Sequence, residues 1–302
     1  PETRLTRLLM VQRFHLIFLL VLLTPFPAPA QSRVDCSVLN SRILKEPVRY
    51  CVLLPPGYDP HSARRYPVLY FLHGLGNNEQ TLFNSGGWSV IEDLRQQHKI
   101  VDFLMVAPAG KQSFYINSAD GRVRYNDFFV GEFMPYIEAN YPIRRERKAR
   151  GITGISMGGY GALRFAFTYS KLFSAVSAES AALITDSPAE LNTAMRARTP
   201  LGRLLSVVFG NPINLAHWRQ NDPLALAKKN AAGVRRVAIY FNCGRNDDYG
   251  FQKGAEALHR QLQAEGITHE FHLYPGDHSL DYFQEHIGET IEFHSRAFES
   301  AK

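Results

Sequence analysis

The sequence predicts an α/β fold in which a mostly parallel central sheet is covered by helices on both faces. Apolar, strand-like runs alternate with segments of helical periodicity along most of the chain, which is typical of a parallel sheet. The run Tyr66–Leu72 is almost continuously apolar, as expected for a strand that is buried on both faces. The chain of 302 residues, with 45% hydrophobic and 21% charged side chains, is also long enough to bury an extensive core.

Strands and helices are expected in a regular order along the chain. The expected strands are Ser37–Leu44, Val48–Leu54 (after a turn at Lys45–Pro47), Tyr66–Leu72, Phe103–Ala107, Ala149–Ile155, Phe173–Ala178, Val237–Asn242 and Glu270–Tyr274. The expected helices are Val90–His98, Phe128–Asn140, Gly159–Tyr169, Gln252–Glu265 and Asp281–Glu299. In Ser180–Gly233 the helical pieces are weak and prolines interrupt them, so we expect a helical insertion (180–233), or lid, over the strand ends.

Residues 1–30 have the pattern of a secretory signal peptide. We expect Met10 to be the start and Leu16–Leu23 to be the apolar core, which is too short to cross a bilayer comfortably. The small residues of Ala28–Ala30 suit cleavage at the end of that segment. We therefore expect a secreted or periplasmic domain over 31–302, without membrane association after cleavage; an uncleaved anchor is the alternative.

The charges of the chain are spread rather than clustered. Lys+Arg 34 against Asp+Glu 28 gives a formal net charge of +6, and no basic stripe stands out. Nucleic acid is therefore not an expected partner, because its binding needs a concentrated basic surface.

The three cysteines bear on compartment and on metal binding. In an exported chain Cys36 could pair with Cys51, but the expected hairpin register does not place them opposite each other, and the pairing stays open. Cys243 lies in an apolar strand and is expected to be a buried, inert thiol. Three cysteines without close spacing predict no metal site.

The sharpest motif is Gly154–Gly159, a G-x-S-x-G sequence between an expected strand and an expected helix. A tight strand-to-helix turn exposes the hydroxyl of the middle residue, Ser156, and the flanking glycines avoid backbone collisions. The N–H groups at the start of the next helix point to where negative charge would develop. We therefore expect Ser156 to be a nucleophile rather than a bystander serine in a structural turn.

A serine nucleophile needs a base and an acid, which follow it in chain order in this type of fold. Among the 11 histidines, His278 lies in a loop directly after an expected strand, whereas the other C-terminal histidines lie within expected helices or strands. Asp247 and Asp248 follow the preceding strand. Only one of them can orient the imidazole; we favour Asp247 and keep Asp248 as the alternative.

Two backbone N–H groups are expected to stabilise the oxyanion of the intermediate. One belongs to Met157, which follows the nucleophile. The other is expected in the glycine-containing loop after Tyr66–Leu72, where Leu75 is the first choice and Gly74 the second. Alone, this loop would be an ordinary glycine-rich connection.

These motifs resemble the esterase D family of the α/β-hydrolase superfamily, which includes S-formylglutathione hydrolases, tributyrin-type carboxylesterases, feruloyl esterases and mycobacterial mycolyltransferases. The resemblance covers about residues 40–295. It is carried by Phe71–Glu79, Gly154–Leu163, Val52–Asp59 and Ser113–Asn117, the last of these pointing to the tributyrin-type branch. Ser279–Tyr282 departs from the family pattern, because many relatives have a tryptophan there.

The resemblance implies a cofactor-free esterase with a Ser-His-Asp triad. It assigns Ser156, Asp247 and His278 to the triad, and the N–H groups of Leu75 and Met157 to the oxyanion hole. We expect a small-molecule or carbohydrate ester substrate with a short acyl group. Trp88, Tyr115 and Asn117 are the candidates for the pocket lining, with buried packing as the expected role of at least one of them.

Three other functions compete with ester hydrolysis. Acyl transfer of the mycolyltransferase type would use the same residues and differ only in excluding water. A formylglutathione-type thioesterase is disfavoured by the export signal, since glutathione is scarce outside the cytosol. A non-enzymatic binding protein is disfavoured by the complete triad.

Overall fold

The structure is a computed structural model that describes residues 31–302 except 187, 197–199 and 301–302. The signal peptide expected over 1–30 lies outside the described residues. The unit 31–302 is built on one eight-stranded sheet with the order β1-β2-β4-β3-β5-β6-β7-β8. The strands are β1 (Arg33–Ser41), β2 (Glu46–Leu54), β3 (Val68–Leu72), β4 (Leu104–Pro108), β5 (Arg150–Gly154), β6 (Ala175–Glu179), β7 (Ala238–Gly244) and β8 (Glu270–Tyr274).

The pairing of these strands confirms the predicted mostly parallel α/β-hydrolase fold. β1, β2 and β4 pair antiparallel, and every other pair is parallel. The strands β3 to β6 are buried at every position, which explains the continuous apolar sequences of β3 and β4.

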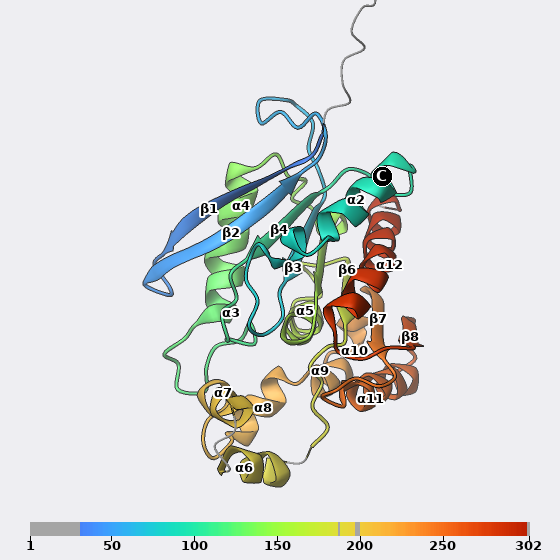
Figure 1. Ribbon diagram of the computed structural model, residues 1–302. Helices are drawn as coiled ribbons and strands as arrows, with labels where there is room; N and C mark the ends of the chain where they lie inside the picture. Colours follow the sequence, from blue (N-terminus) through green and yellow to red (C-terminus); the bar gives the residue numbers. More distant parts are fainter. Residues whose placement is uncertain (1–30, 187, 197–199, 301–302) are drawn as a thin grey trace, which may run out of the picture. The chain divides into compact units, whose positions relative to one another are not determined.

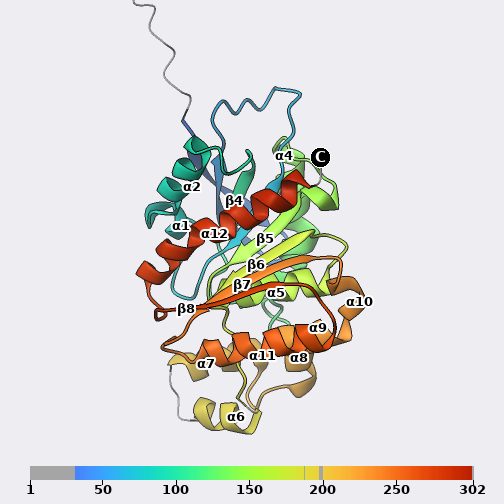
Figure 2. The same cartoon turned by 90° about the vertical axis from the view of Figure 1, so that its right-hand side faces the viewer.

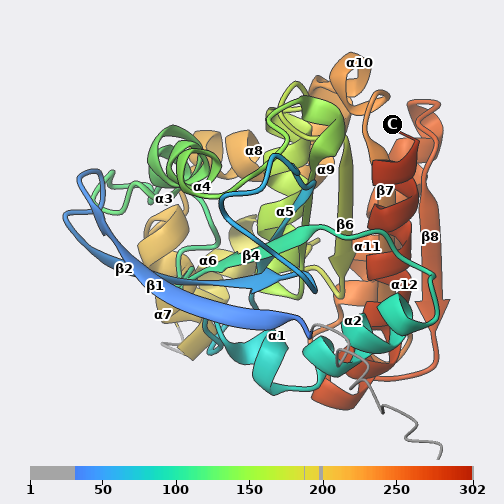
Figure 3. The same ribbon diagram turned by 90° about the horizontal axis from the view of Figure 1, so that it is seen from above.

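Helices cover both faces of the sheet (Figure 3). They are α1 (Thr81–Asn84), α2 (Gly87–Gln96), α3 (Tyr125–Phe128), α4 (Met134–Asn140), α5 (Met157–Thr168), α6 (Pro188–Arg196), α7 (Pro200–Phe209), α8 (Leu215–Asn221), α9 (Pro223–Lys229), α10 (Ala231–Val234), α11 (Phe251–Ala264) and α12 (Leu280–Glu299). α2 and α12 pack on one face, where α12 crosses β5, β6 and β7 (Figure 2). α4, α5 and α11 bury their apolar sides on the other face. No helix in the described part of the chain is long and apolar enough to cross a bilayer.

The predicted helix over Phe128–Asn140 is in fact a composite. It begins at Tyr125 as α3, passes through a π-helical turn at Phe129–Phe133 and continues as α4. Pro135 lies in the first turn of α4 and has no N–H to donate to the preceding turn. The wider π-helical turn before it tolerates this missing hydrogen bond.

The insertion between β6 and β7 is helical, as predicted. It consists of α6 to α10 (Figure 1). Three of these helices begin at a proline, at Pro188, Pro200 and Pro223, where the missing N–H is unused in any helix.

The predicted register of the N-terminal hairpin was wrong. The turn occupies Arg42–Lys45, earlier than expected, and β1 begins at Arg33. In this register Cys36 lies directly opposite Cys51, with 4.0 Å between their Cα atoms, and the two form a disulfide. The pairing of Cys36 with Cys51, which the sequence left undecided, is therefore present. The third cysteine, Cys243, is free and buried, as expected.

Candidate active site

Ser156 occupies the tight turn between β5 and α5. Its φ of 56° is a left-handed conformation, which is strained for a residue with a side chain. Gly154 and Gly158 permit this turn, because a Cβ on Gly154 would collide with the backbone of Gly158, and one on Gly158 with the backbone of Leu72. The Ser156 N–H donates to the carbonyl oxygen of Glu179 at 2.9 Å, which ties the turn to β6.

His278 reaches Ser156 from the loop between β8 and α12. Its Nε2 lies 3.0 Å from Ser156 Oγ, and its Nδ1 lies 2.6 Å from Asp247 Oδ2. Because the carboxylate can only accept, Nδ1 carries the proton and Nε2 is left to accept from the hydroxyl. The imidazole is held edge-on to the rings of Tyr249 and Phe251, at centroid distances of 4.9 and 5.4 Å.

The two adjacent carboxylates have different partners. Asp247 contacts the ring of His278, whereas Asp248 accepts from the backbone N–H of His278 at 3.3 Å. The other oxygen of Asp247 accepts from the N–H groups of Tyr249 and Phe251, at 3.0 and 3.3 Å. Burial alone would raise the pKa of Asp247, but the hydrogen bond and charge of His278 and these N–H groups lower it below the ordinary value.

A buried thiol adds a further contact to Asp247. Cys243 Sγ lies 3.6 Å from Oδ2, the oxygen that also accepts from His278. Burial raises the pKa of the Cys243 thiol to about 12, so the group stays protonated and donates. The sequence did not indicate this contact.

The loop after β3 brings Gly74 and Leu75 next to Ser156. A Cβ on Gly74 would lie only 3.5 Å from Ser156 Cβ, so the backbone passes close to the nucleophile. Leu75 and Met157 both line the same cleft as Ser156. Since α5 begins at Met157, its N–H has no acceptor within the helix and is free for a substrate oxygen.

This loop is fixed from below by His73. The buried imidazole accepts from Gly110 N–H at 2.7 Å through Nε2, and the Tyr115 hydroxyl donates to the carbonyl oxygen of His73 at 2.9 Å. Burial lowers the pKa of His73, so the ring is neutral and can accept. A histidine directly between a buried strand and a glycine is the signal that would have indicated this support.

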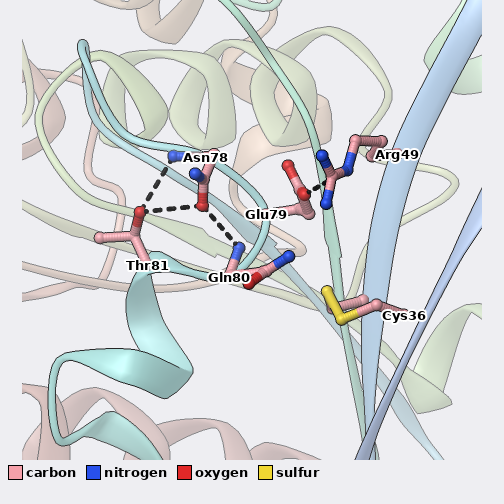
Figure 4. The surroundings of a disulfide bond; sticks show 7 residues. Cys36, Arg49, Asn78, Glu79, Gln80 and Thr81 are labelled. Atoms are coloured by element: carbon pink, nitrogen blue, oxygen red, sulfur yellow. Dashed lines mark hydrogen bonds and ion pairs between the residues drawn. A yellow bond between two sulfur atoms is a disulfide. The ribbon is translucent and has the colours of Figure 1, made fainter.

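The far end of the same loop is tied to β2 (Figure 4). The buried carboxylate of Glu79 pairs with Arg49 at 3.0 Å, close to the disulfide. Asn78 and Thr81 bond to each other and close the turn that leads into α1.

Ser156 and His278 open into a cleft of about 620 Å³. Its walls are largely apolar, and come from the loops after β4 and β7, from α7 in the insertion and from the start of α12. The contributing apolar side chains are Phe114, Leu204, Tyr249, Phe251, Leu280 and Phe283.

None of the three expected pocket residues lines this cleft. Trp88 of α2 is half-buried against the apolar cluster on that face of the sheet and donates to Ser32 Oγ at 2.7 Å. Tyr115 is fully buried beneath His73, and Asn117 donates to Asp127 at 3.0 Å. The reason is local backbone geometry: Phe114 and Tyr115 have φ of 51° and 59°, and this turn places Phe114 in the cleft wall in place of its neighbour.

The described residues do not form a cluster of side chains that could coordinate a metal ion. Among residues 31–302 that the structure describes, no group of three or more His, Cys, Asp or Glu side chains is placed to hold one.

The fold and the site define an α/β-hydrolase of the serine type. The family model described as "Putative esterase" matches residues 41–293, and the chain belongs to this esterase family. An acetyl esterase of Caldicellulosiruptor saccharolyticus is 30% identical over 85% of this chain and 96% of that protein.

Solved structures agree with this assignment. A ferulic acid esterase superposes with a TM-score of 0.75 at 25% identity, over 89% of this chain and 99% of that one. An S-formylglutathione hydrolase of Staphylococcus aureus shares the fold, with a TM-score of 0.71 at 22% identity, over 88% of this chain and 100% of that one. The protein is therefore a carboxylic ester hydrolase.

Proposed function

We propose that Ser156, His278 and Asp247 are the catalytic triad of a carboxylesterase that acts on esters with a short acyl group. The observation that carries the proposal is the continuous hydrogen-bonded chain from Asp247 through His278 to the hydroxyl of Ser156, a residue that lines the cleft. His278 accepts the hydroxyl proton as Ser156 Oγ attacks the ester carbonyl, and Asp247 stabilises the resulting imidazolium.

The reaction has two halves, and each passes through a tetrahedral intermediate with a negatively charged oxygen. The N–H groups of Leu75 and Met157 hold the oxyanion, an interaction worth about 3 kcal/mol for each donor in a water-excluding site. His278 then gives its proton to the leaving alcohol, which departs and leaves the acyl group on Ser156. Water attacks this acyl-enzyme with His278 again as the base, and releases the carboxylic acid and the free hydroxyl.

The proposed natural substrate is a small-molecule or carbohydrate-linked carboxylic ester. The names of the acetyl esterase and the ferulic acid esterase among the relatives support a carboxylic ester, and the open side of the cleft supports a bulky alcohol part. Transfer of the acyl group to an alcohol instead of water is the second candidate, because the triad would be the same. Added acceptor alcohols separate the two through the ratio of transfer product to free acid.

Export to the periplasm or the medium is part of the proposal. The apolar run Leu16–Leu23 and the Cys36–Cys51 disulfide, a bond that persists in oxidising compartments, both support it. Fractionation of cells that express the full chain tests this: activity in the cytosol would contradict it.

Hydrolysis of p-nitrophenyl acetate by the purified protein tests the proposed chemistry. Ser156→Ala is expected to abolish turnover, whereas Ser89→Ala, at an exposed serine of α2, is expected to keep it. Full activity in Ser156→Ala would overturn the assignment.

A further inference from the structure

A narrow apolar crevice extends from the Ser156 cleft toward the core beneath α1. It lies between α1 and the first turns of α12, and its apolar lining is Phe71, Leu82, Ile155, Leu280, Phe283 and Ile287. Ile155 directly precedes Ser156, and Gly74, Ile155, Leu280 and Phe283 line both the crevice and the main cleft. The crevice is therefore an inner arm of the same site.

A second and much wider arm, the outer arm, extends from the same cleft. It has a volume of about 620 Å³ and is lined by Lys111, Gln112, Ser113 and Ser118 together with exposed Val123 and Val207. Asn77 and Gln112 line both this arm and the cleft that holds Ser156. The outer arm is therefore wide and includes Lys111 and several polar side chains in its lining, whereas the inner arm is narrow and almost entirely apolar.

The order of events in ester hydrolysis assigns a different part of the substrate to each arm. The alcohol leaves first and needs a route to solvent, while the acyl group stays attached to Ser156 through the second half of the reaction. A narrow apolar arm suits the retained acyl group and would leave a polar alcohol without hydrogen-bond partners. The wide arm, which includes Lys111 and polar side chains in its lining, suits the alcohol.

We propose that the inner crevice is the acyl-binding subsite and that Leu82 forms its end wall and sets the maximum acyl length. This inference rests on the proposed function. The crevice volume is about 30 Å³. Since a cavity of about 10–15 Å³ holds one water molecule, the space accommodates about two heavy atoms beyond the ester carbonyl, as in a propanoyl group.

The wall at Leu82 is held in place from two sides. A Cβ on Gly87 would lie 2.5 Å from Leu82 Cδ1, so α2 packs against this side chain at the closest distance that a glycine permits. Gln284 of α12 donates to the carbonyl oxygen of Ser85, which ties α12 to the end of α1 beside the crevice. Leu82 is 5% exposed and cannot move aside for a longer chain without repacking.

Leu82→Ala tests the proposal through the ratio of kcat/KM for p-nitrophenyl butanoate to that for the acetate. Butanoate is one methylene longer than the propanoyl group that the wild-type crevice accommodates, and a methylene that gains a buried position contributes about fourfold, so the ratio is expected to rise about fourfold over the wild type. Leu94→Ala is the matched control: Leu94 is buried in the same apolar cluster but does not line the crevice, and its ratio is expected to stay at the wild-type value. A ratio is independent of the fraction of protein that is folded.

A substitution that fills the crevice is expected to disfavour longer acyl groups, and it creates no cavity in the core. Ser85→Leu, at the half-buried entrance of the crevice, is expected to lower the ratio for propanoate to acetate. Unchanged ratios in both Leu82→Ala and Ser85→Leu would overturn the assignment of the crevice, while hydrolysis itself continued. A wild-type protein that hydrolysed none of these esters would instead contradict the proposed function.

Discussion

Glu179 makes the stability of the protein depend on pH in a way that one substitution tests. Its side chain is fully buried at the end of β6, and in the described structure neither carboxylate oxygen has a hydrogen-bond partner. Burial raises the pKa of Glu179 from 4.5 to about 8; the charge of Glu289 on α12 adds to the rise, and Thr290 partly opposes it. Tyr282 of α12 also faces this carboxyl group. The group is therefore protonated and neutral in the folded protein at pH 7.

The sign of the effect follows from the protons bound in each state. Between pH 4.5 and 8 the folded state keeps a proton on Glu179 that the unfolded state has lost. The free energy of unfolding therefore falls as pH rises, by up to about 1.4 kcal/mol per pH unit, and levels off above the folded pKa. From pH 6 to 8 this contribution amounts to about 2–3 kcal/mol.

Glu179→Gln replaces the protonated carboxyl with a neutral group of the same shape and removes the pH-dependent contribution of Glu179 to the free energy of unfolding. Urea unfolding between pH 5 and 9 is expected to show nearly equal stability at pH 5 and a growing advantage of the variant toward pH 8. Glu285→Gln, at an exposed position of α12, controls for the loss of a formal charge. Parallel pH profiles for the wild type and Glu179→Gln would refute the reasoning.

Two further predictions concern the site and the edge of the sheet. Asp247→Asn is expected to lower kcat by about 10⁴ with the fold intact, because the amide no longer fixes the tautomer of His278. Asp248→Asn affects only a backbone contact and is expected to lower kcat far less. Equal losses of kcat in the two variants would contradict the assignment of Asp247. Replacing Cys36 and Cys51 by serine is expected to lower the free energy of unfolding by about 3 kcal/mol, because the disulfide closes a separation of 15 residues, while kcat at 25 °C stays close to that of the wild type. Denaturant titrations of both forms measure the difference, and an unchanged midpoint would show that the hairpin gains nothing from the bond.

Most of the sheet and the identity of the residues around the nucleophile were predictable from the sequence. Buried parallel strands have continuous apolar runs, and the chemistry-bearing residues follow strand ends, as Ser156 follows β5 and Asp247 follows β7. The structure brings Ser156, Asp247 and His278 together as predicted, although they lie far apart in the chain.

The pocket walls and the hairpin register were not predictable in the same way. Phe114 and Tyr115 have positive φ without being glycines, so the sequence offers no sign that the chain turns there and exchanges which ring faces the cleft. The hairpin turn contains no glycine either, and Lys45 takes the left-handed conformation that fixes the register of Cys36 and Cys51. In both segments tertiary packing selects a backbone conformation that local sequence preferences do not favour.

The central claim is that an acyl group is carried by the hydroxyl of Ser156 after His278 has taken its proton. Rapid acid quenching of the protein during turnover of p-nitrophenyl acetate, followed by peptide mass spectrometry, tests it most directly. The acetyl group is expected on the peptide that contains Ser156, and absent from that peptide in Ser156→Ala. An acetyl group found on another residue, or turnover that continues in the alanine variant, would contradict the account.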